Sequence, residues 1–360
     1  MTWQETLRIF ERVLQTTGRG ERVAVATVIR IDGSAYRRPG AKLLIEQDGA
    51  MIGNVSSGCL ESDLKEIALV VMSENAPRLR HYDTGSDENT VWGLGLGCNG
   101  SVDVFVRPFT PDEGESPVAP LLRLLSCDNP FVVSTVVAGD QALGSTLTVT
   151  VDGSVTGSTG DVALDSRISE HALAALGDGK SAVQDIGSLQ IFAEVLVPLP
   201  QLVICGAGDD AIPLVASASD QGFRVTVADH RPAYLTTERF PDAAQLIEMR
   251  ADEGGELPAG ADTYVVIMTH LVDRDREWTR YFMPTEVPYI GILGPRSRTE
   301  EILAGIEPRN RDRIYGPVGL DIGAERPEQV ALSIMAELLA ISSGHVPRHL
   351  REKDGPIHDD

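Results

Sequence analysis

The chain has 360 residues, more than one ordinary hydrophobic core accommodates, so two or three domains are expected. Hydrophobic residues make up 42% of the sequence and charged residues 23%, which is normal for a soluble globular protein. The formal net charge of -22 argues against nonspecific nucleic-acid binding, because such binding needs a basic surface.

The first part of the sequence alternates between helical and strand-like patterns. In chain order it predicts a helix at 2–17, strands at 23–31 and 42–46, a helix at about 60–72 and a strand at 102–106. Glycine-rich segments precede the second helix and the last of these strands. Residues 110–119 have the composition of a linker.

The segment after the linker repeats the pattern of the segment before it. Three stretches correspond in order: 26–29 with 134–137, 43–54 with 147–158, and 60–69 with 164–173. Two hairpins with Asp-Gly turns can look alike by chance, which is the alternative explanation. The shared order of strand, turn, strand, loop and helix favours an internal duplication, with halves 1–110 and 120–197 forming one α/β domain over residues 1–197.

The differences between the two halves indicate where the chemistry lies. Cys59 corresponds to Ala163, the turn that contains Arg37 is shortened in the second half, and the loop that carries Cys98 has no counterpart. The fold does not need these three residues if its second copy forms without them. They are therefore candidate functional residues.

Cys59 and Cys98 both follow glycines. Cys59 comes after Gly58 and before a helix, where the helix dipole stabilises a thiolate. Such a thiol suits a metal ligand, a persulfide carrier or a nucleophile, although a small buried cysteine is the simpler interpretation. Glu61 would cap or orient the same turn. Cys98 follows Gly97 in a loop whose amides can form an anion-binding nest.

The remaining candidates of this half are less specific. Arg37 lies in a turn near these loops and would hold phosphate or oxo groups, unless it forms an ordinary surface ion pair. Cys127 and Cys205 are interpreted as structural. No cysteine belongs to a C-x-x-C pair, no apolar run is long enough to span a membrane, and no signal-peptide pattern is present, so we expect a cytoplasmic protein.

From residue 201 onward the pattern is typical of a Rossmann-like domain, expected over 198–345 and followed by a polar tail at 346–360. The predicted elements are a strand at 202–205, a helix to about 221, strands at 223–228, 264–268 and 289–293, and a helix at 328–342. The strands are continuous apolar runs, as in parallel sheets buried on both faces. The last helix is expected to bury a stripe of six apolar side chains, namely Val330, Ala331, Ile334, Met335, Leu338 and Leu339.

A glycine motif, G-x-G-x-x-A, joins the first strand of this domain to its helix. Gly206 permits a tight turn, Gly208 lets the backbone approach a phosphate, and Ala211 allows close helix packing. Asp229 ends the second strand, where it would accept a hydrogen bond from a ribose hydroxyl. The pair 209–210 lies at the helix N-terminus, where two aspartates either leave room for a diphosphate or cap the helix in competition with it.

Polar residues follow two further strands of this domain. His270 comes after the strand at 264–268, at the edge where α/β sheets place ligand contacts. With Asp275 it would form a metal-binding or acid/base pair. Arg296 and Arg298, after the next strand, would reach the same crevice.

Several ordered segments resemble the XdhC/CoxI family, the accessory factors of xanthine dehydrogenase and related molybdenum hydroxylases. They are GSAYRRPGAKLLIEQDG, SGC-x-E at 57–61, YDTGSDENTVWGLGLGCNG, GAGDDAIPLVASASDQGFRVTVADHRPAY, YIGILGPRSR and PVGLDIGAERPEQVALSIMAELLA. The resemblance covers almost the whole chain. It implies an N-terminal XdhC/CoxI domain followed by a Rossmann domain.

The resemblance also implies a function. Family members bind the molybdenum cofactor, assist its sulfuration by a cysteine desulfurase and transfer it to the apo-hydroxylase. The chain is thus expected to be a maturation factor, or chaperone, that binds molybdopterin or its dinucleotide form, with Cys59 or Cys98 facing the metal. Two alternatives are an NAD(P)-dependent oxidoreductase and a scaffold that touches no cofactor. A homodimer is also expected.

Overall fold

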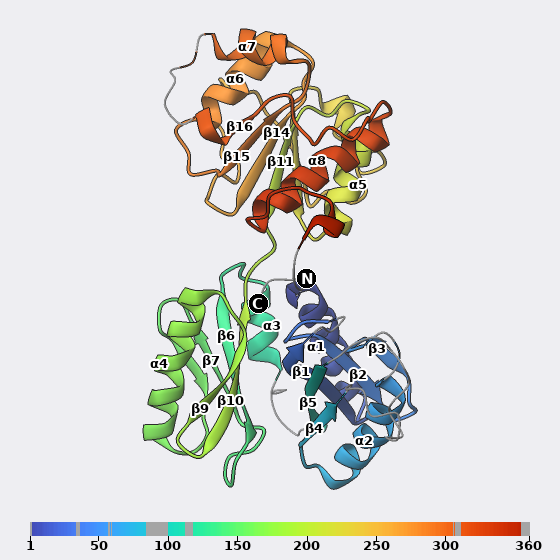
Figure 1. Cartoon of the computed structure of the whole chain (residues 1–360), viewed down its shortest axis with the longest axis vertical. Coiled ribbons are helices and arrows are strands. Elements are labelled where there is room, and N and C mark those ends of the chain that lie inside the picture. Colours follow the sequence, from blue (N-terminus) through green and yellow to red (C-terminus); the bar gives the residue numbers. More distant parts are fainter. Residues whose placement is uncertain are drawn as a thin grey trace. The chain divides into compact units, whose positions relative to one another are not determined.

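The structure is a computed structural model that describes residues 2–33, 37–56, 58, 60–83, 100–111, 118–304, 306 and 311–353. The chain divides into two compact units, an N-terminal unit of residues 1–198 and a C-terminal unit of residues 199–360 (Figure 1). Among the described residues, no helix is both long and apolar enough to cross a membrane.

The first half of the N-terminal unit is an antiparallel sheet of five strands in the order β3-β2-β1-β5-β4. Its elements are α1 (Thr2–Gly18), β1 (Val23–Gly33), β2 (Lys42–Glu46), β3 (Met51–Gly53), α2 (Glu61–Glu74), β4 (Arg78–Asp83) and β5 (Gly100–Phe109). The predicted helices and strands are all present. β4 was not predicted from the sequence, because it is exposed along most of its length and has no apolar alternation.

The second half repeats this topology, with strand order β8-β7-β6-β10-β9. Its elements are α3 (Ala119–Leu125), β6 (Phe131–Ala138), β7 (Thr146–Thr150), β8 (Val155–Gly157), α4 (Val162–Asp178), β9 (Ala182–Ile186) and β10 (Leu189–Leu196). Each strand occupies the position of its counterpart in the first sheet, so the predicted duplication is confirmed. The predicted linker ends where α3 begins.

Each sheet of this unit has a helix on its outer face (Figure 1). The core of the first sheet packs against α2, and that of the second packs against α4. The inner faces of the two sheets meet in a small apolar cluster that consists of Ile29 and Phe105 from the first sheet and Val137 and Phe192 from the second. The two halves therefore form one packed unit.

The C-terminal unit is a six-stranded parallel sheet in the order β13-β12-β11-β14-β15-β16. Its strands and α-helices are β11 (Gln201–Cys205), α5 (Ala211–Asp220), β12 (Arg224–Asp229), β13 (Gln245–Glu248), β14 (Thr263–Ile267), α6 (Val272–Phe282), β15 (Tyr289–Ile292), α7 (Arg296–Leu303), β16 (Ile314–Tyr315) and α8 (Pro327–Ser342). This is the Rossmann order, and its switch point lies between β11 and β14.

Two hydrophobic cores cover the faces of this sheet. α5 and α8 pack on one face, and α6 packs on the other (Figure 1). The sequence did not predict β13, β16 or α6, because the strands are short and α6 is rich in charged residues. The predicted stripe of α8 is wrong at Leu339, which is 40% exposed.

Candidate functional site at the carboxyl edge of the parallel sheet

The glycine motif forms the turn between β11 and α5. Gly206 has φ +119°, and a Cβ there would lie 2.7 Å from the carbonyl oxygen of Met268, so the turn packs directly on the end of β14. Only glycine fits such a position without strain. A Cβ on Gly208 would meet nothing closer than the His270 ring at 3.8 Å. Gly208 is therefore not required by packing, and its backbone is accessible to a ligand.

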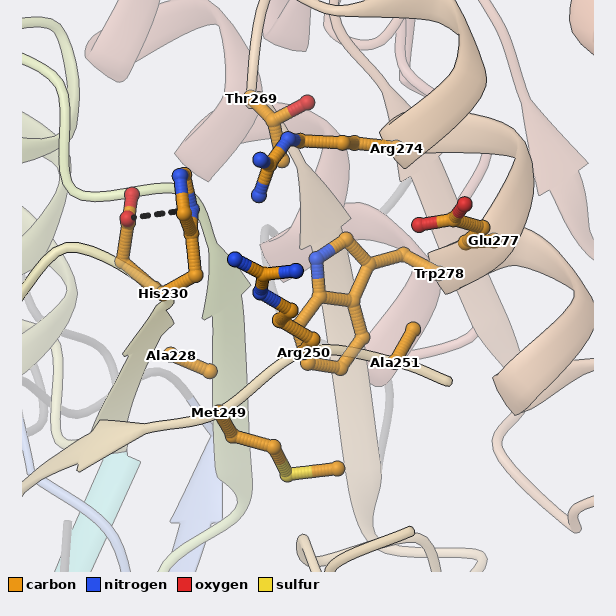
Figure 2. A pocket seen from close by; sticks show the side chains of 10 residues that line it. Ala228, His230, Met249, Arg250, Ala251, Thr269, Arg274, Glu277 and Trp278 are labelled. Carbon is orange, nitrogen blue, oxygen red and sulfur yellow. Dashed lines mark ion pairs between the residues drawn. The ribbon is translucent and has the colours of Figure 1, made fainter. Parts of the chain in front are cut away.

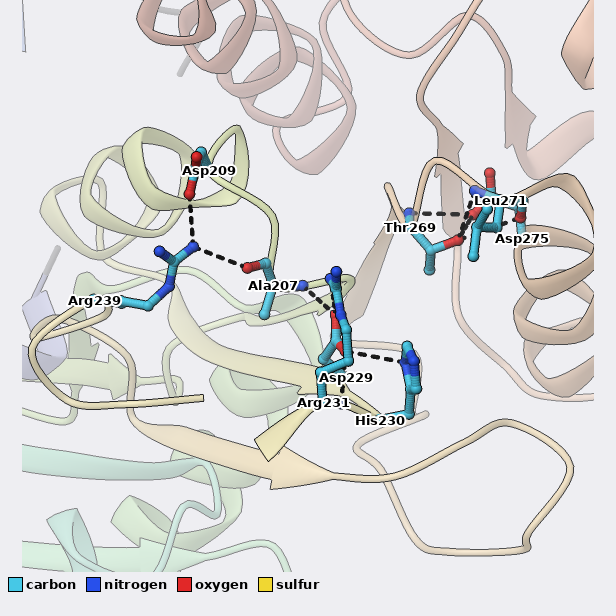
Figure 3. Close-up of polar contacts among 9 residues, drawn as sticks. All are labelled: Ala207, Asp209, Asp229, His230, Arg231, Arg239, Thr269, Leu271 and Asp275. Atoms are coloured by element: carbon cyan, nitrogen blue, oxygen red, sulfur yellow. Dashed lines mark hydrogen bonds and ion pairs between the residues drawn. The ribbon is translucent and has the colours of Figure 1, made fainter. Parts of the chain in front are cut away.

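Side chains on both sides hold this turn in place (Figure 3). The amide of Ala207 donates to Asp229 at 2.7 Å, and the Arg239 guanidinium donates to the Ala207 carbonyl at 3.1 Å. Arg239 also pairs with Asp209 at 2.8 Å. The turn is thus fixed before any ligand arrives, which reduces the entropy lost on binding.

Three amides of the turn remain without an acceptor in the described part of the chain: those of Gly208, Asp209 and Asp210. Asp210 is the N-cap residue of α5, yet its side chain makes no capping hydrogen bond. The possible competition between an aspartate cap and a phosphate is therefore not observed. Free amides at the N-terminus of a helix attract anions. Ala211 is fully buried, in agreement with its predicted role in close packing of the helix.

Asp229 lies at the end of β12 and is 4% exposed. Besides the Ala207 amide, it accepts hydrogen bonds from the Arg231 amide at 2.9 Å and from the Arg231 guanidinium at 2.9 and 3.0 Å. Burial by itself would raise the pKa of Asp229, but these hydrogen bonds outweigh it and lower the pKa to about 2. The carboxylate stays ionised, and both of its oxygens are engaged within the protein.

His270 lies beside the turn, with a left-handed φ of +63° and an ion-pair distance of 3.2 Å from its Nε2 to Asp210. The predicted pairing of His270 with Asp275 is wrong. Asp275 is fully buried and accepts a hydrogen bond from Thr269 instead (Figure 3). It also pairs with the Arg298 guanidinium. A non-glycine residue at such a φ is strained, and strain of this kind is concentrated at functional sites.

A small cavity of about 10 Å³ borders Asp229 and lies among the ends of β12, β13 and β14 (Figure 2). Its lining includes His230, Arg250, Thr269, Arg274, Glu277 and Trp278. The cavity has room for about one water molecule, so it is not a nucleotide pocket in this conformation.

The lining of the cavity carries charges of both signs, because Arg250 and Arg274 are cations and Asp229 and Glu277 are carboxylates. Burial lowers the pKa of His230, the charge of Arg274 lowers it further, and the charge of Asp229 opposes this by raising it, with smaller lowering effects from Arg231 and Arg250. Arg250 pairs with Glu253 at 3.5 Å, while Arg274 is half-buried and has no carboxylate partner among the described residues. Within the described part of the chain, Arg274 is thus the arginine of this lining whose charge is not paired with a carboxylate.

The other predicted residues of this unit contribute less to the edge. Arg296 begins α7, is exposed and does not line the cavity. Arg298 supports Asp275, and through it Thr269. Cys205 is fully buried at the end of β11, and burial raises its pKa, in keeping with a structural role.

In the N-terminal unit, Glu61 fixes the turn before α2. Its carboxylate accepts from the amides of Val55 and Leu60 at 3.3 and 3.1 Å, and from both the amide and the hydroxyl of Ser56. Burial alone would raise the pKa of Glu61, but the hydrogen bonds lower it. Asp165, its counterpart, holds the turn before α4 in the same way. This function of Glu61 is shared by both halves and belongs to the scaffold.

The predicted thiol site falls mostly outside the described part of the chain. Cys59, Gly97 and Cys98 lie outside the described residues. Gly58 is described and has φ +110°, a conformation that favours glycine. Within the described ranges, no group of three or more His, Cys, Asp or Glu residues is arranged to hold a metal ion.

Arg37 is held by an ion pair, whereas Cys127 is exposed. Arg37 donates to both carboxylate oxygens of Glu5 on α1, at 2.6 and 2.5 Å, and both side chains are 19% exposed. It anchors its turn to the helix, and binding of an oxo group there remains a prediction. Cys127 is exposed after α3, where its thiol donates to the Arg123 carbonyl at 3.1 Å, so it is not a core residue.

Four residues at the edge of the parallel sheet were not predicted from the sequence: Arg231, Arg239, Arg250 and Arg274. Arg231 follows Asp229 directly, so its position after the second strand was an available signal. Arg250 follows β13 and Arg274 lies on α6, two elements that the sequence pattern did not predict. Arg239 reaches the turn from 30 residues away, and no local pattern indicates that contact.

Comparison with known proteins agrees with this architecture. The family model of the XdhC Rossmann domain matches residues 202–338, and that of the XdhC and CoxI family matches residues 17–83 and 124–187, one segment in each half of the N-terminal unit. A protein of Bacillus subtilis, described as a probable component of xanthine dehydrogenase, is 32% identical over 330 residues, which cover 89% of this chain and 93% of that protein.

Two further proteins are similar. The uncharacterized protein YqeB of Escherichia coli is 27% identical over 242 residues, which cover 59% of this chain and 44% of that protein. A crystal structure described as a xanthine dehydrogenase of Bacillus halodurans superposes with a TM-score of 0.78 at 30% identity, covering 93% of this chain and 96% of that one.

A duplicated antiparallel α/β unit followed by a Rossmann-like unit with a glycine turn at its carboxyl edge defines the class as a two-unit α/β protein. With both family models matched and a relative aligned along most of its length, the chain belongs to the XdhC and CoxI family. The family predicted from the sequence motifs is thereby confirmed.

Proposed function

We propose that this protein is a maturation factor for a molybdenum hydroxylase of the xanthine dehydrogenase, CO dehydrogenase or aldehyde oxidase type. It binds the pterin molybdenum cofactor, supports its sulfuration together with a cysteine desulfurase, and delivers it to the apo-hydroxylase. Family membership and the names of two relatives, both described as xanthine dehydrogenase proteins, support the type of client.

The observation that carries the cofactor part is the unpaired amide turn at Gly208–Asp210, together with the cationic cluster of Arg250 and Arg274 at the same edge of the sheet. The pterin cofactor ends in a phosphate or in a diphosphate with a nucleotide. A helix N-terminus with free amides binds such a group, and guanidinium groups hold its oxygens in a bidentate manner.

The charges of the turn fit a phosphate. Asp209 pairs with Arg239, so its charge is compensated within the protein, and Asp210 lies 3.2 Å from the Nε2 atom of His270. Gly208 leaves space for the phosphate to approach the backbone. When bound, the cofactor supplies a molybdenum centre whose terminal sulfur is exchangeable, and the residues of this edge hold its phosphate end.

The engagement of Asp229 weighs against the NAD(P)-dependent alternative. An NAD-binding domain commonly uses an acidic residue at this position to accept from a ribose hydroxyl. Here both oxygens of Asp229 are bound to Ala207 and Arg231, and the side chain is buried. Using it for ribose would require these contacts to break.

The test is metal and pterin analysis of the protein after co-expression with a cofactor-producing pathway. We expect molybdenum and pterin to co-purify with the wild type, and to be reduced in a Cys59→Ala/Cys98→Ala variant. Recovery of the protein without pterin under these conditions would contradict cofactor binding. Full pterin retention by the double variant would contradict the role of the thiols alone. Steady turnover with NAD(H) would favour the oxidoreductase alternative.

A further inference from the structure

The N-terminal unit contains a second, larger cavity that the proposed cofactor site does not use. It is a cleft of about 440 Å³ between the inner faces of the two sheets. β1 and β5 form one wall, β6 and β10 form the other, and residues of α1 and α3 border it. This volume lies in the range of small-molecule binding sites.

One wall of the cleft carries a cation without a partner. Phe105, Arg107 and Phe109 alternate along β5 and thus share a face of the sheet, and all three line the cleft. The Arg107 guanidinium lies 4.9 Å from the centre of the Phe109 ring, and no carboxylate of the described residues pairs with it. Burial lowers the pKa of Arg107 to about 10, so it remains charged at neutral pH.

The duplication explains why this arginine is unpaired. Arg107 lies opposite Val25 in the first sheet, and Glu194 lies opposite Val133 in the second, so the two charged residues occupy equivalent positions. Glu194 forms an ion pair across the cleft with Lys42.

The counterpart of Lys42 in the second half breaks the symmetry. Lys42 lies opposite Thr27 in the first sheet, and Thr146 lies opposite Thr135 in the second. Where Lys42 offers a charge to Glu194, Thr146 therefore offers only a hydroxyl to the side of the cleft that contains Arg107. One of the two equivalent positions therefore holds the ion pair Lys42–Glu194. The other holds Arg107 without a carboxylate partner among the described residues.

We propose that this cleft binds a small organic anion with an apolar or aromatic body, whose charged group pairs with Arg107. Arg107 is half-buried and has no counter-ion among the described residues, so a carboxylate or sulfonate that enters the cleft would gain a charge-assisted contact with it. The aromatic side chains of Phe10, Phe105 and Phe192 suit the apolar body, and the hydroxyls of Thr135 and Thr148 add polar contacts. The site is independent of the proposed function of the C-terminal unit.

The experiment uses the full chain and two matched probes, the aromatic sulfonate 1-anilinonaphthalene-8-sulfonate and its uncharged analogue N-phenyl-1-naphthylamine. Fluorescence titration is expected to show saturable binding of the sulfonate to the wild type. Arg107→Gln should weaken sulfonate binding about tenfold or more, since a charge-assisted hydrogen bond is lost, and should leave the neutral probe within about twofold. Arg78→Gln, which removes an exposed arginine of β4, is the control and should change neither affinity.

A second variant tests the proposal without removing Arg107. Thr146→Glu places a carboxylate at the position equivalent to Lys42, and is expected to pair with Arg107 and weaken sulfonate binding about tenfold or more in a folded protein. Equal sulfonate affinity in the wild type and either folded variant would overturn the proposal. Absence of saturable binding to the wild type would overturn it as well.

Discussion

Lys42 on β2 and Glu194 on β10 form a buried ion pair that joins the two halves of the N-terminal unit, with side chains that are 2% and 8% exposed. Lys42 also donates to the Thr6 hydroxyl and to the Gly40 carbonyl, so its ammonium group has three acceptors within the protein. Removal of either charge would leave the other buried without a counter-ion, which is costly.

Glu194→Gln is therefore expected to lower the free energy of unfolding of the N-terminal unit by about 3 kcal/mol. The double variant Lys42→Met/Glu194→Leu should lose much less than the sum of the two single changes, because it buries no unpaired charge. Urea unfolding of the wild type, Lys42→Met, Glu194→Leu and the double variant measures this coupling. Arg78→Gln, at an exposed pair with Glu74, serves as the control and should cost less than about 1 kcal/mol. Additive losses in the double variant would contradict a direct pair.

Asp229→Asn tests the lowered pKa at the end of β12. A carboxylate whose pKa is depressed in the folded state stabilises that state above its unfolded pKa, and the contribution is lost as the pH falls through the folded value of about 2. The variant should be less stable than the wild type by about 2 kcal/mol at pH 7 and by about half as much at pH 3. Unfolding of both proteins at the two pH values gives the comparison, and a difference that does not depend on pH would refute it.

Gly206 and Gly208 are expected to respond differently to the same substitution. Gly206→Ala adds a Cβ 2.7 Å from the Met268 carbonyl oxygen at a left-handed φ, and should cost about 2 kcal/mol or more. Gly208→Ala meets no close neighbour, so its thermal stability should remain near that of the wild type while pterin retention falls. Thermal unfolding with pterin analysis separates the two effects. Equal destabilisation by both changes would show that the turn has another conformation.

Arg250→Gln/Arg274→Gln tests the cationic cluster beside the turn. If the cluster attracts the phosphate end of the cofactor, this variant should retain less pterin, and its retention should depend less on salt concentration than that of the wild type. The measurement is pterin content after washing at increasing ionic strength. Arg280→Gln, an exposed arginine also on α6, is the matched control. Identical salt dependence in the wild type and the variant would exclude the cluster from binding.

Much of the architecture follows from local patterns in the sequence. The strand of continuous apolar residues before Gly206, the helix after it and the acid at position 229 predict a Rossmann unit, because turn geometry and hydrophobic periodicity act over a few residues. The correspondence between 43–54 and 147–158 likewise predicts two sheets of one topology. Charged or very short elements such as α6 and β16 carry no such periodicity, and were missed.

The partners of the charged groups were decided only by the tertiary structure. His270 pairs with Asp210 rather than Asp275, and Asp229 turns toward the Ala207 amide. Strand register places Arg107 and Glu194 at equivalent positions of the two sheets. Of these two residues, Glu194 has an ion-pair partner among the described residues and Arg107 has none. The sequence alone indicated the two units because helices, turns and repeats are encoded locally, and the family was identified from the resemblance of its motifs. Ion pairs depend on which strands become neighbours and in what register, and that is determined when the whole sheet packs.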